Sequence, residues 1–156
     1  MAERPAERWE PATRHEVYGE LDHPADVFLE VWGTDLPTLF ENALFALYDQ
    51  LAELEGFNVE REETITVSAP SNAEALRALL SEALYRFETD GFIAVRADIK
   101  LESSVGEVRV NARLHGETLD KHRHTLLTEV KAVTYHQLAV DVVPEGGWRA
   151  TLLFDV

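Results

Sequence analysis

The sequence predicts an α+β fold, a single domain in which two amphipathic helices pack on a largely antiparallel sheet. Two segments carry apolar residues at helical spacing, and most other apolar residues alternate with polar ones, as in half-buried strands. The helices interrupt the first half of the chain and the strands run together in the second half, an order typical of α+β domains. At 156 residues, one such domain buries roughly 70% of its unfolded surface without disulfides or metals.

The first helix is predicted to begin after Thr34–Asp35, because either side chain can cap a helix and Pro37 follows in the first turn. Gly56 is the predicted stop, since glycine is common just after a helix. The apolar face of this helix comprises Leu36, Leu39, Phe40, Ala43, Leu44, Leu47, Tyr48 and Leu51.

The second helix is predicted to open with a capping box formed by Ser71 and Glu74 and to end at Gly91. Its buried face is predicted to comprise Leu76, Leu79, Leu80, Ala83, Leu84 and Phe87.

Strands are predicted in the remaining segments, in the order strand, strand, helix, strand, helix and then about four strands. Turn-forming residues at 103–106 and 144–147 predict two hairpins. Besides a first strand earlier in the chain, the strands are predicted at 27–32, 65–67, 93–101, 108–114, 133–143 and 148–154.

The segment Met1–Arg14 is charged and carries proline, and it lacks the apolar stretch of a secretory signal. We interpret residues 1–14 as a disordered or loosely docked tail outside the core, and residues 15–156 as the domain. No apolar run approaches the length that spans a bilayer, so no membrane association is expected. The absence of cysteine fits a reducing compartment, and we expect a cytoplasmic protein.

The chain has 14 basic and 29 acidic residues, a formal charge of −15. Such a chain repels phosphate backbones at long range, so strong direct binding of nucleic acid is not expected. The charge favours divalent cations or a basic protein partner, although solubility alone also explains it.

Two acidic groups of residues are candidate metal ligands. Asp22, His23 and Asp26 lie within five residues just before a predicted strand, although the same residue types also make ordinary polar turns. At the other end, Asp155 adjoins the α-carboxylate of Val156 on a strand that runs to the last residue. Hard cations such as Ca²⁺ or Mg²⁺ prefer oxygen ligands of this kind, whereas a solvated strand end needs no cation.

Two further segments concentrate polar groups. Residues 116–124, which include Lys121, His122 and His124, are a basic group inside an acidic chain. They could meet phosphate or the carboxylates of a partner, or form a solvated loop. Residues 129–136 include Lys131 and His136, which are also consistent with outward strand positions paired across a ladder.

The sequence resembles the archease family in several blocks that are collinear from about residue 17 to residue 156. Residues 23–27 resemble the family signature His-Thr-Ala-Asp-Val, with Pro24 in place of threonine, which removes a hydroxyl group and a backbone donor at this position. The other matching positions are 30–33, 87–92, 116–117, 120, 123–124, 130–136, 148–150 and 155–156.

The resemblance implies a function. Archeases act on RtcB-type tRNA-splicing ligases, which join RNA ends that carry a 3′-phosphate with GTP and metal, and they promote guanylylation and multiple turnover of the ligase. The family binds a divalent cation, described as calcium, and by position its ligands correspond here to Asp26, Asp155 and Val156. Candidates for contacting the ligase are His23, Lys121, Lys131 and His136.

Two other functions stay open at this point. One is an independent metal-dependent hydrolase that uses His23, Asp26 and Asp155, although no nucleophile–base pair or phosphate-cradling glycine loop is evident. The other is a general chaperone or binding module. Activity without the ligase would identify a hydrolase, and protection of unrelated proteins from aggregation would identify a chaperone.

Overall fold

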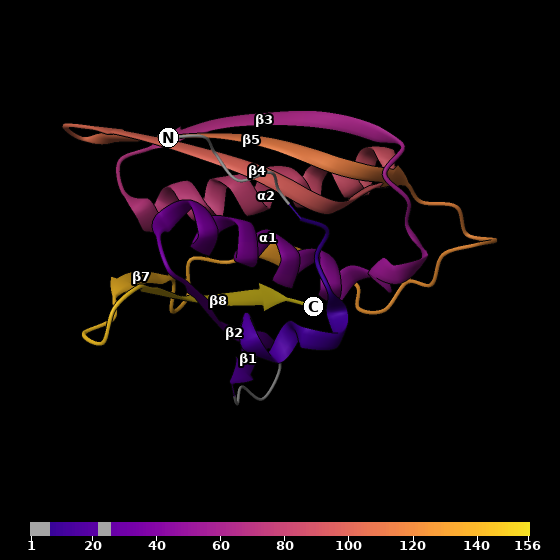
Figure 1. Ribbon diagram of the computed structural model, residues 1–156, viewed down its shortest axis with the longest axis horizontal. Coiled ribbons are helices and arrows are strands. Elements are labelled where there is room, and N and C mark those ends of the chain that lie inside the picture. Colours follow the sequence, from indigo (N-terminus) through magenta and orange to yellow (C-terminus); the bar gives the residue numbers. More distant parts are fainter. Residues whose placement is uncertain (1–6, 22–25) are drawn as a thin grey trace.

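Two helices lie between two antiparallel sheets in the computed structural model, which describes residues 7–21 and 26–156 (Figure 1). The helices are α1 (Leu36–Leu51) and α2 (Asn72–Asp90). One sheet has the order β1-β2-β8-β6, with β7 also paired to β8; the other has the order β3-β5-β4. The strands are β1 (Tyr18–Leu21), β2 (Val27–Gly33), β3 (Arg61–Ala69), β4 (Phe92–Ser104), β5 (Glu107–Thr118), β6 (Ala132–Val133), β7 (Ala139–Val142) and β8 (Trp148–Asp155). The predicted α+β fold class is confirmed, and the helices are covered by sheet on both sides.

The start of α1 is as predicted, but its end is not. Asp35 is the N-cap and accepts a hydrogen bond from the Thr38 N–H at 2.8 Å. The helix ends at Leu51, and Gly56 instead ends a short 3₁₀ helix, η2 (Leu54–Gly56). The chain leaves the helix here because it pairs with a distant segment: the Glu53 N–H donates to the Thr125 carbonyl at 3.0 Å.

Both ends of α2 are confirmed. The Ser71 hydroxyl accepts from the Glu74 N–H at 3.2 Å, which satisfies a donor that has no partner within the helix. Gly91 adopts φ of +73°, and its N–H donates to the Phe87 carbonyl at 2.8 Å. This left-handed conformation is the one that favours glycine after a helix.

The strand predicted over 133–143 is interrupted, so this prediction is wrong. Its two ends, β6 and β7, both pair with β8, and residues 134–138 form a turn between them. Gln137 in this turn has φ of +56°, which no strand residue adopts. The strand predicted at 65–67 is longer, β3, because it pairs along its whole length with β5.

The N-terminal segment packs into the core, so the exclusion of residues 7–14 from the core is wrong; residues 1–6 lie outside the described residues. Trp9 is 7% exposed and its ring stacks on Phe45 at 5.6 Å between centroids. The backbone N–H of Trp9 donates to the Val95 carbonyl at 2.9 Å. Residues 11–16 continue as a 3₁₀ helix, η1 (Pro11–Glu16). Phe45 lies outside the apolar face predicted for α1. It is nevertheless buried, because sheets cover α1 on two sides and Trp9 packs on the Phe45 ring.

Replacing Trp9 therefore tests whether this segment is part of the folded domain. Trp9→Ala is expected to lower the free energy of unfolding by about 3–5 kcal/mol, the usual effect of truncating a buried aromatic side chain. Urea denaturation measures it, with Trp9→Phe as the control that keeps a ring on Phe45. A change within about 0.5 kcal/mol for Trp9→Ala would instead support the loosely docked tail.

None of the helices in the described ranges is long and apolar enough to cross a membrane.

Candidate functional site

The pairing of β2 with β8 brings two of the predicted metal ligands together. The two strands are antiparallel, with Val27 opposite Phe154. Asp26 directly precedes Val27 and Asp155 directly follows Phe154, so both aspartates lie next to the opposed pair at this end of the ladder. The Cα atoms of such an opposed pair are about 4.5–5.5 Å apart. The two carboxylates, distant in sequence, thus come from adjacent strand ends.

The other edge of β8 is held by the segment around β6. Ala132 lies opposite Asp155, and the Lys131 N–H donates to the Asp155 carbonyl at 2.7 Å. Phe154 is fully buried, whereas Asp155 is exposed and Val156 is 37% exposed. The end of β8 is therefore fixed by neighbours on both sides while its carboxylates remain accessible.

The chemistry of these donors fits a hard cation. Like charges directly opposite each other in a ladder are destabilising unless a proton or a cation intervenes. Carboxylate oxygens are the ligands that Ca²⁺ and Mg²⁺ prefer. Within the described ranges no group of three or more His, Cys, Asp or Glu side chains is arranged to hold a metal. The ligand set that the sequence predicts adds the α-carboxylate of Val156 to Asp26 and Asp155.

The remaining candidates do not form one surface. His23 and Pro24, like Asp22, lie outside the described residues. Lys131 and His136 are both exposed and flank β6. Lys121 is exposed on the loop that follows β5 and projects at one end of the molecule (Figure 1). The structure therefore brings Lys131 to the carboxylates and keeps Lys121 on a separate loop.

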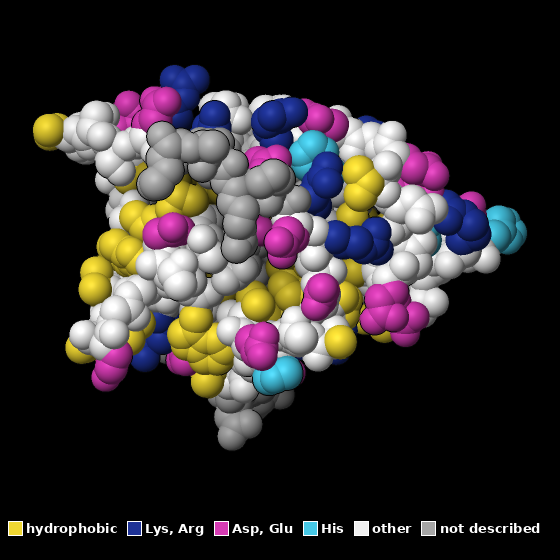
Figure 2. All heavy atoms as spheres, in the orientation of Figure 1, with side chains coloured by type: hydrophobic (Ala, Val, Ile, Leu, Met, Phe, Trp, Pro, Cys, Tyr) yellow, Lys and Arg dark blue, Asp and Glu magenta, His cyan; other side chains and the backbone are white. Residues whose placement is uncertain are grey.

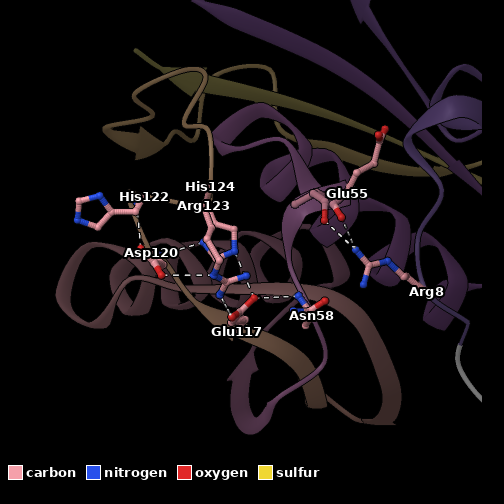
Figure 3. Close-up of polar contacts among 9 residues, drawn as sticks. Arg8, Glu55, Asn58, Glu117, Asp120, His122, Arg123 and His124 are labelled. Atoms are coloured by element: carbon pink, nitrogen blue, oxygen red, sulfur yellow. Dashed lines mark hydrogen bonds and ion pairs between the residues drawn. The ribbon is translucent and has the colours of Figure 1, made fainter.

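A second polar cluster surrounds Glu117 at the end of β5, and Figure 3 shows its members pointing toward one another. Glu117 is only 4% exposed, and its carboxylate accepts from the Asn58 N–H at 2.9 Å and from the Arg123 guanidinium. The residue before Glu117 is Gly116, and any larger residue there would clash, because its Cβ would lie 1.9 Å from the Ile93 carbonyl oxygen. This close contact between β4 and β5 sets the position of Glu117.

His124 completes the cluster. Its ring stacks on Phe57 with centroids 3.6 Å apart, and its side chain is fully buried. Nδ1 accepts from the Asp120 N–H at 2.8 Å. In the neutral ring the proton therefore sits on Nε2, which lies 3.2 Å from Glu117.

The cluster changes the interpretation of the basic segment 116–124. Arg123 binds both Glu117 and Asp120, although its side chain stays partly exposed, and His124 is buried. Lys121 and His122, like Arg123, are exposed on this loop. Most of the basic character seen in the sequence therefore neutralises carboxylates inside this same protein.

The pKa of Glu117 reflects this balance. Burial alone would raise the pKa of this carboxyl, but the Asn58 N–H and the Arg123 guanidinium outweigh burial and lower the pKa below its usual range. A carboxyl whose folded-state pKa is lowered contributes stability above its unfolded pKa of 4.5, and this contribution is lost as the pH falls through the folded-state value.

Glu117→Gln is expected to lower the free energy of unfolding at pH 7 by about 1–3 kcal/mol, because charge-assisted hydrogen bonds are lost in a buried position. The difference from wild type should shrink as the pH falls below about 4.5. Urea denaturation at several pH values measures both effects. Glu60→Gln, an exposed change nearby, is the control, and a pH-independent difference for Glu117→Gln would contradict the assignment.

The sequence analysis missed a third polar group, around Asp49. This carboxylate is 6% exposed and accepts from Arg14 Nε at 2.5 Å and from the Tyr18 hydroxyl at 2.6 Å. Burial, followed by the bond to Asp49, raises the pKa of Tyr18. These residues line a pocket of about 600 Å³ beside η1. The sequence contained a signal for this group: Asp49 lies beside apolar positions of the predicted helix, and a buried carboxylate needs a partner.

Comparison with known proteins gives one consistent result. The model of the archease protein family matches residues 18–156. An archease from Methanosarcina mazei is 31% identical over 140 residues, which cover 89% of this chain and 95% of that protein. An archease from Archaeoglobus fulgidus is 33% identical over 129 residues, 83% of this chain and 92% of that protein.

Two solved structures share the fold. The solution structure of protein 1598 from Methanobacterium thermoautotrophicum superposes with a TM-score of 0.79 at 22% identity, covering 89% of this chain and 98% of that one. The crystal structure of an archease from Thermotoga maritima, described as a possible chaperone, gives a TM-score of 0.55 at 19% identity. This match covers 88% of this chain and 96% of that one.

Proposed function

Because this chain belongs to the archease family, we propose that it is a non-catalytic, metal-binding accessory protein of an RtcB-type ligase in tRNA splicing. It promotes guanylylation and multiple turnover of this GTP-dependent ligase, which joins RNA ends that carry a 3′-phosphate. The observation that supports the metal part is the β2–β8 register: Val27 lies opposite Phe154, so Asp26 and Asp155 adjoin the same end of the strand pair. The ligase as partner comes from the family resemblance of the sequence.

In this proposal Asp26, Asp155 and the α-carboxylate of Val156 hold one divalent cation, Ca²⁺ in first place, with Mg²⁺ as the alternative. The cation offsets two of the three negative charges at one strand end and fixes the geometry there. The backbone bond from Lys131 to Asp155 holds the carboxylates in position from the β6 side. The chain supplies a rigid, charged surface rather than a reacting group.

The charge of the chain supports a protein as the partner. The net charge is −15, and Figure 2 shows acidic and basic side chains interspersed on the face in view. A broad basic surface, which phosphate backbones require, is absent from this face. The partner is then a protein that meets the carboxylate-rich strand end, and the proposed location is the cytoplasm.

Neither alternative function gains a specific observation. The hydrolase would need His23, which lies outside the described residues, and Glu117 and His124 are both buried, each in hydrogen bonds to neighbouring residues. A general chaperone would need a broad apolar surface. Among described residues the exposed large apolar side chains are scattered along the chain, with only Leu126 and Leu127 adjacent in sequence: Val59, Tyr85, Val105, Leu126, Leu127, Tyr135, Val142 and Val156.

The test is a guanylylation assay with the RtcB-type ligase encoded in the same genome, GTP and metal, at substoichiometric amounts of this protein. The expected result is a faster formation of the ligase–GMP adduct and more turnovers per ligase, with no RNA joining by this protein alone. Equal rates and equal turnovers with and without it would overturn the proposal. Hydrolysis of RNA or phosphate esters without the ligase would favour the hydrolase.

A further inference from the structure

Tyr135 is a large aromatic side chain that is exposed and yet held in place. It is 66% exposed, in the turn between β6 and β7. The guanidinium carbon of Arg77, which comes from α2, lies 3.7 Å from the centre of the tyrosine ring. Arg77 is itself fixed, because its Nε donates to the Val133 carbonyl at 2.9 Å. One face of the ring is therefore occupied by a cation that the fold positions.

The turn that carries Tyr135 is also fixed by its own hydrogen bonds. The Thr134 N–H donates to the Leu153 carbonyl at 3.0 Å, and the Thr151 hydroxyl donates to the Gln137 carbonyl at 2.5 Å. Gln137, with φ of +56°, is the one non-glycine residue with positive φ in the described ranges. Such a conformation costs free energy and persists only where surrounding contacts impose it.

Stability of the fold does not account for this arrangement. An exposed cation–π contact contributes only about 0.5–1 kcal/mol, while two large side chains are ordered and an aromatic ring stays in water. Binding does account for it. Tyrosine and arginine are enriched among the residues that dominate protein interfaces, and a side chain already held in its bound conformation loses less entropy on association.

The location of the turn connects it to the carboxylates. Tyr135 follows β6, in which Ala132 lies opposite Asp155. The exposed residues Lys131 and His136 flank the same short strand. A partner that engages Tyr135 is therefore brought to the strand end that carries Asp155 and Val156.

We propose that Tyr135, stacked on Arg77, is the anchor by which this protein docks on its ligase, and this inference rests on the proposed function. The ring inserts into an apolar pocket of the ligase with an acceptor for the phenol hydroxyl. A protein partner is favoured over a stacked RNA base, because the net charge of −15 opposes binding of a phosphate backbone.

The experiment compares Tyr135→Ala with Tyr85→Ala. Tyr85 is a matched control, since it is 58% exposed on α2, eight residues after Arg77 and about 12 Å farther along the helix. Calorimetry measures affinity for the RNA-free ligase, and the guanylylation assay measures activation. Tyr135→Ala is expected to weaken ligase binding about 30-fold, as for a central interface residue, and Tyr85→Ala less than about twofold.

Two further variants, together with calcium affinity and the urea midpoint as controls, separate anchoring from other roles. Tyr135→Phe keeps the ring on Arg77 and should retain binding within about fivefold, whereas Arg77→Met should weaken binding about fivefold by freeing the ring. Calcium affinity should be unchanged in all four variants, because none of these residues is a proposed ligand. The urea midpoint should be unchanged in the three tyrosine variants and somewhat lower in Arg77→Met, which loses the hydrogen bond to the Val133 carbonyl.

The inference is overturned if Tyr135→Ala binds and activates the ligase as wild type does, or if Tyr85→Ala loses as much. It is also overturned if Tyr135→Ala loses affinity for a single-stranded RNA oligonucleotide but not for the ligase. A wild-type protein that neither binds nor activates the ligase overturns the proposed function, and this inference with it.

Discussion

Asp26→Asn is expected to abolish calcium binding and ligase activation while the fold is retained. The substitution keeps the size of the side chain and removes one of the carboxylates at this end of the β2–β8 pair. Affinity at such sites depends strongly on the number of anionic ligands, so loss of one should weaken Ca²⁺ binding by about 100-fold or more. Calorimetric titration with Ca²⁺ and the guanylylation assay measure the two losses.

The control for this variant is Glu145→Gln, which removes an exposed carboxylate in the β7–β8 turn and should leave both activities unchanged. Circular dichroism offers a further check: the far-UV spectrum of Asp26→Asn without a cation should match that of the wild type. A folded Asp26→Asn protein that binds Ca²⁺ and activates the ligase normally would refute the assignment.

A C-terminal extension is expected to have an effect of similar size. In the proposed site the α-carboxylate of Val156 is a ligand, and any added residue converts it to a neutral amide. Even a single appended glycine moves the carboxylate by about 3.3 Å along the strand. Calcium affinity and activation should both fall by about 100-fold or more in the extended protein. Cleavage back to a native Val156 end should restore them.

An N-terminal tag of equal length is the control and should leave calcium affinity and activation unchanged. The alternative, a solvated strand end without a cation, predicts that a flexible extension changes stability by no more than about 0.5 kcal/mol and activity not at all. Equal affinity and equal activation for both tagged proteins would remove Val156 from the site and leave Asp26 and Asp155 alone.

Where an element is bounded by local interactions, the sequence predicts it well. The ends of α2 follow from Ser71 and Gly91, each of which bonds a residue within four positions along the chain. The hairpin between β7 and β8 follows in the same way from its proline and glycines. Capping and turn chemistry depend on near neighbours in sequence, which is why a single sequence contains enough information for them.

Elements whose limits depend on distant partners were predicted less well. The end of α1 is set by pairing of Glu53 with Thr125 rather than by Gly56. The interruption between β6 and β7 arises because both pair with one strand, β8. Trp9 is buried because α1 lies between two sheets and Phe45 needs a cover. None of these partners can be identified from a hydrophobic period, which reports only which face of an element is apolar.

The same division holds for the candidate sites. The sequence by itself determined which residues carry hard oxygen donors, with Asp26 at a strand entrance and Asp155 beside the chain end. Tertiary structure decided that the two lie at the same end of one strand pair, because strand order and register bring β2 beside β8. It also turned Arg123 and His124 inward onto Glu117 and set Arg77 against Tyr135. A side chain's type is local, but its partner depends on how the layers pack, since the free energy of burying a charge or a ring is decided by the groups that surround it.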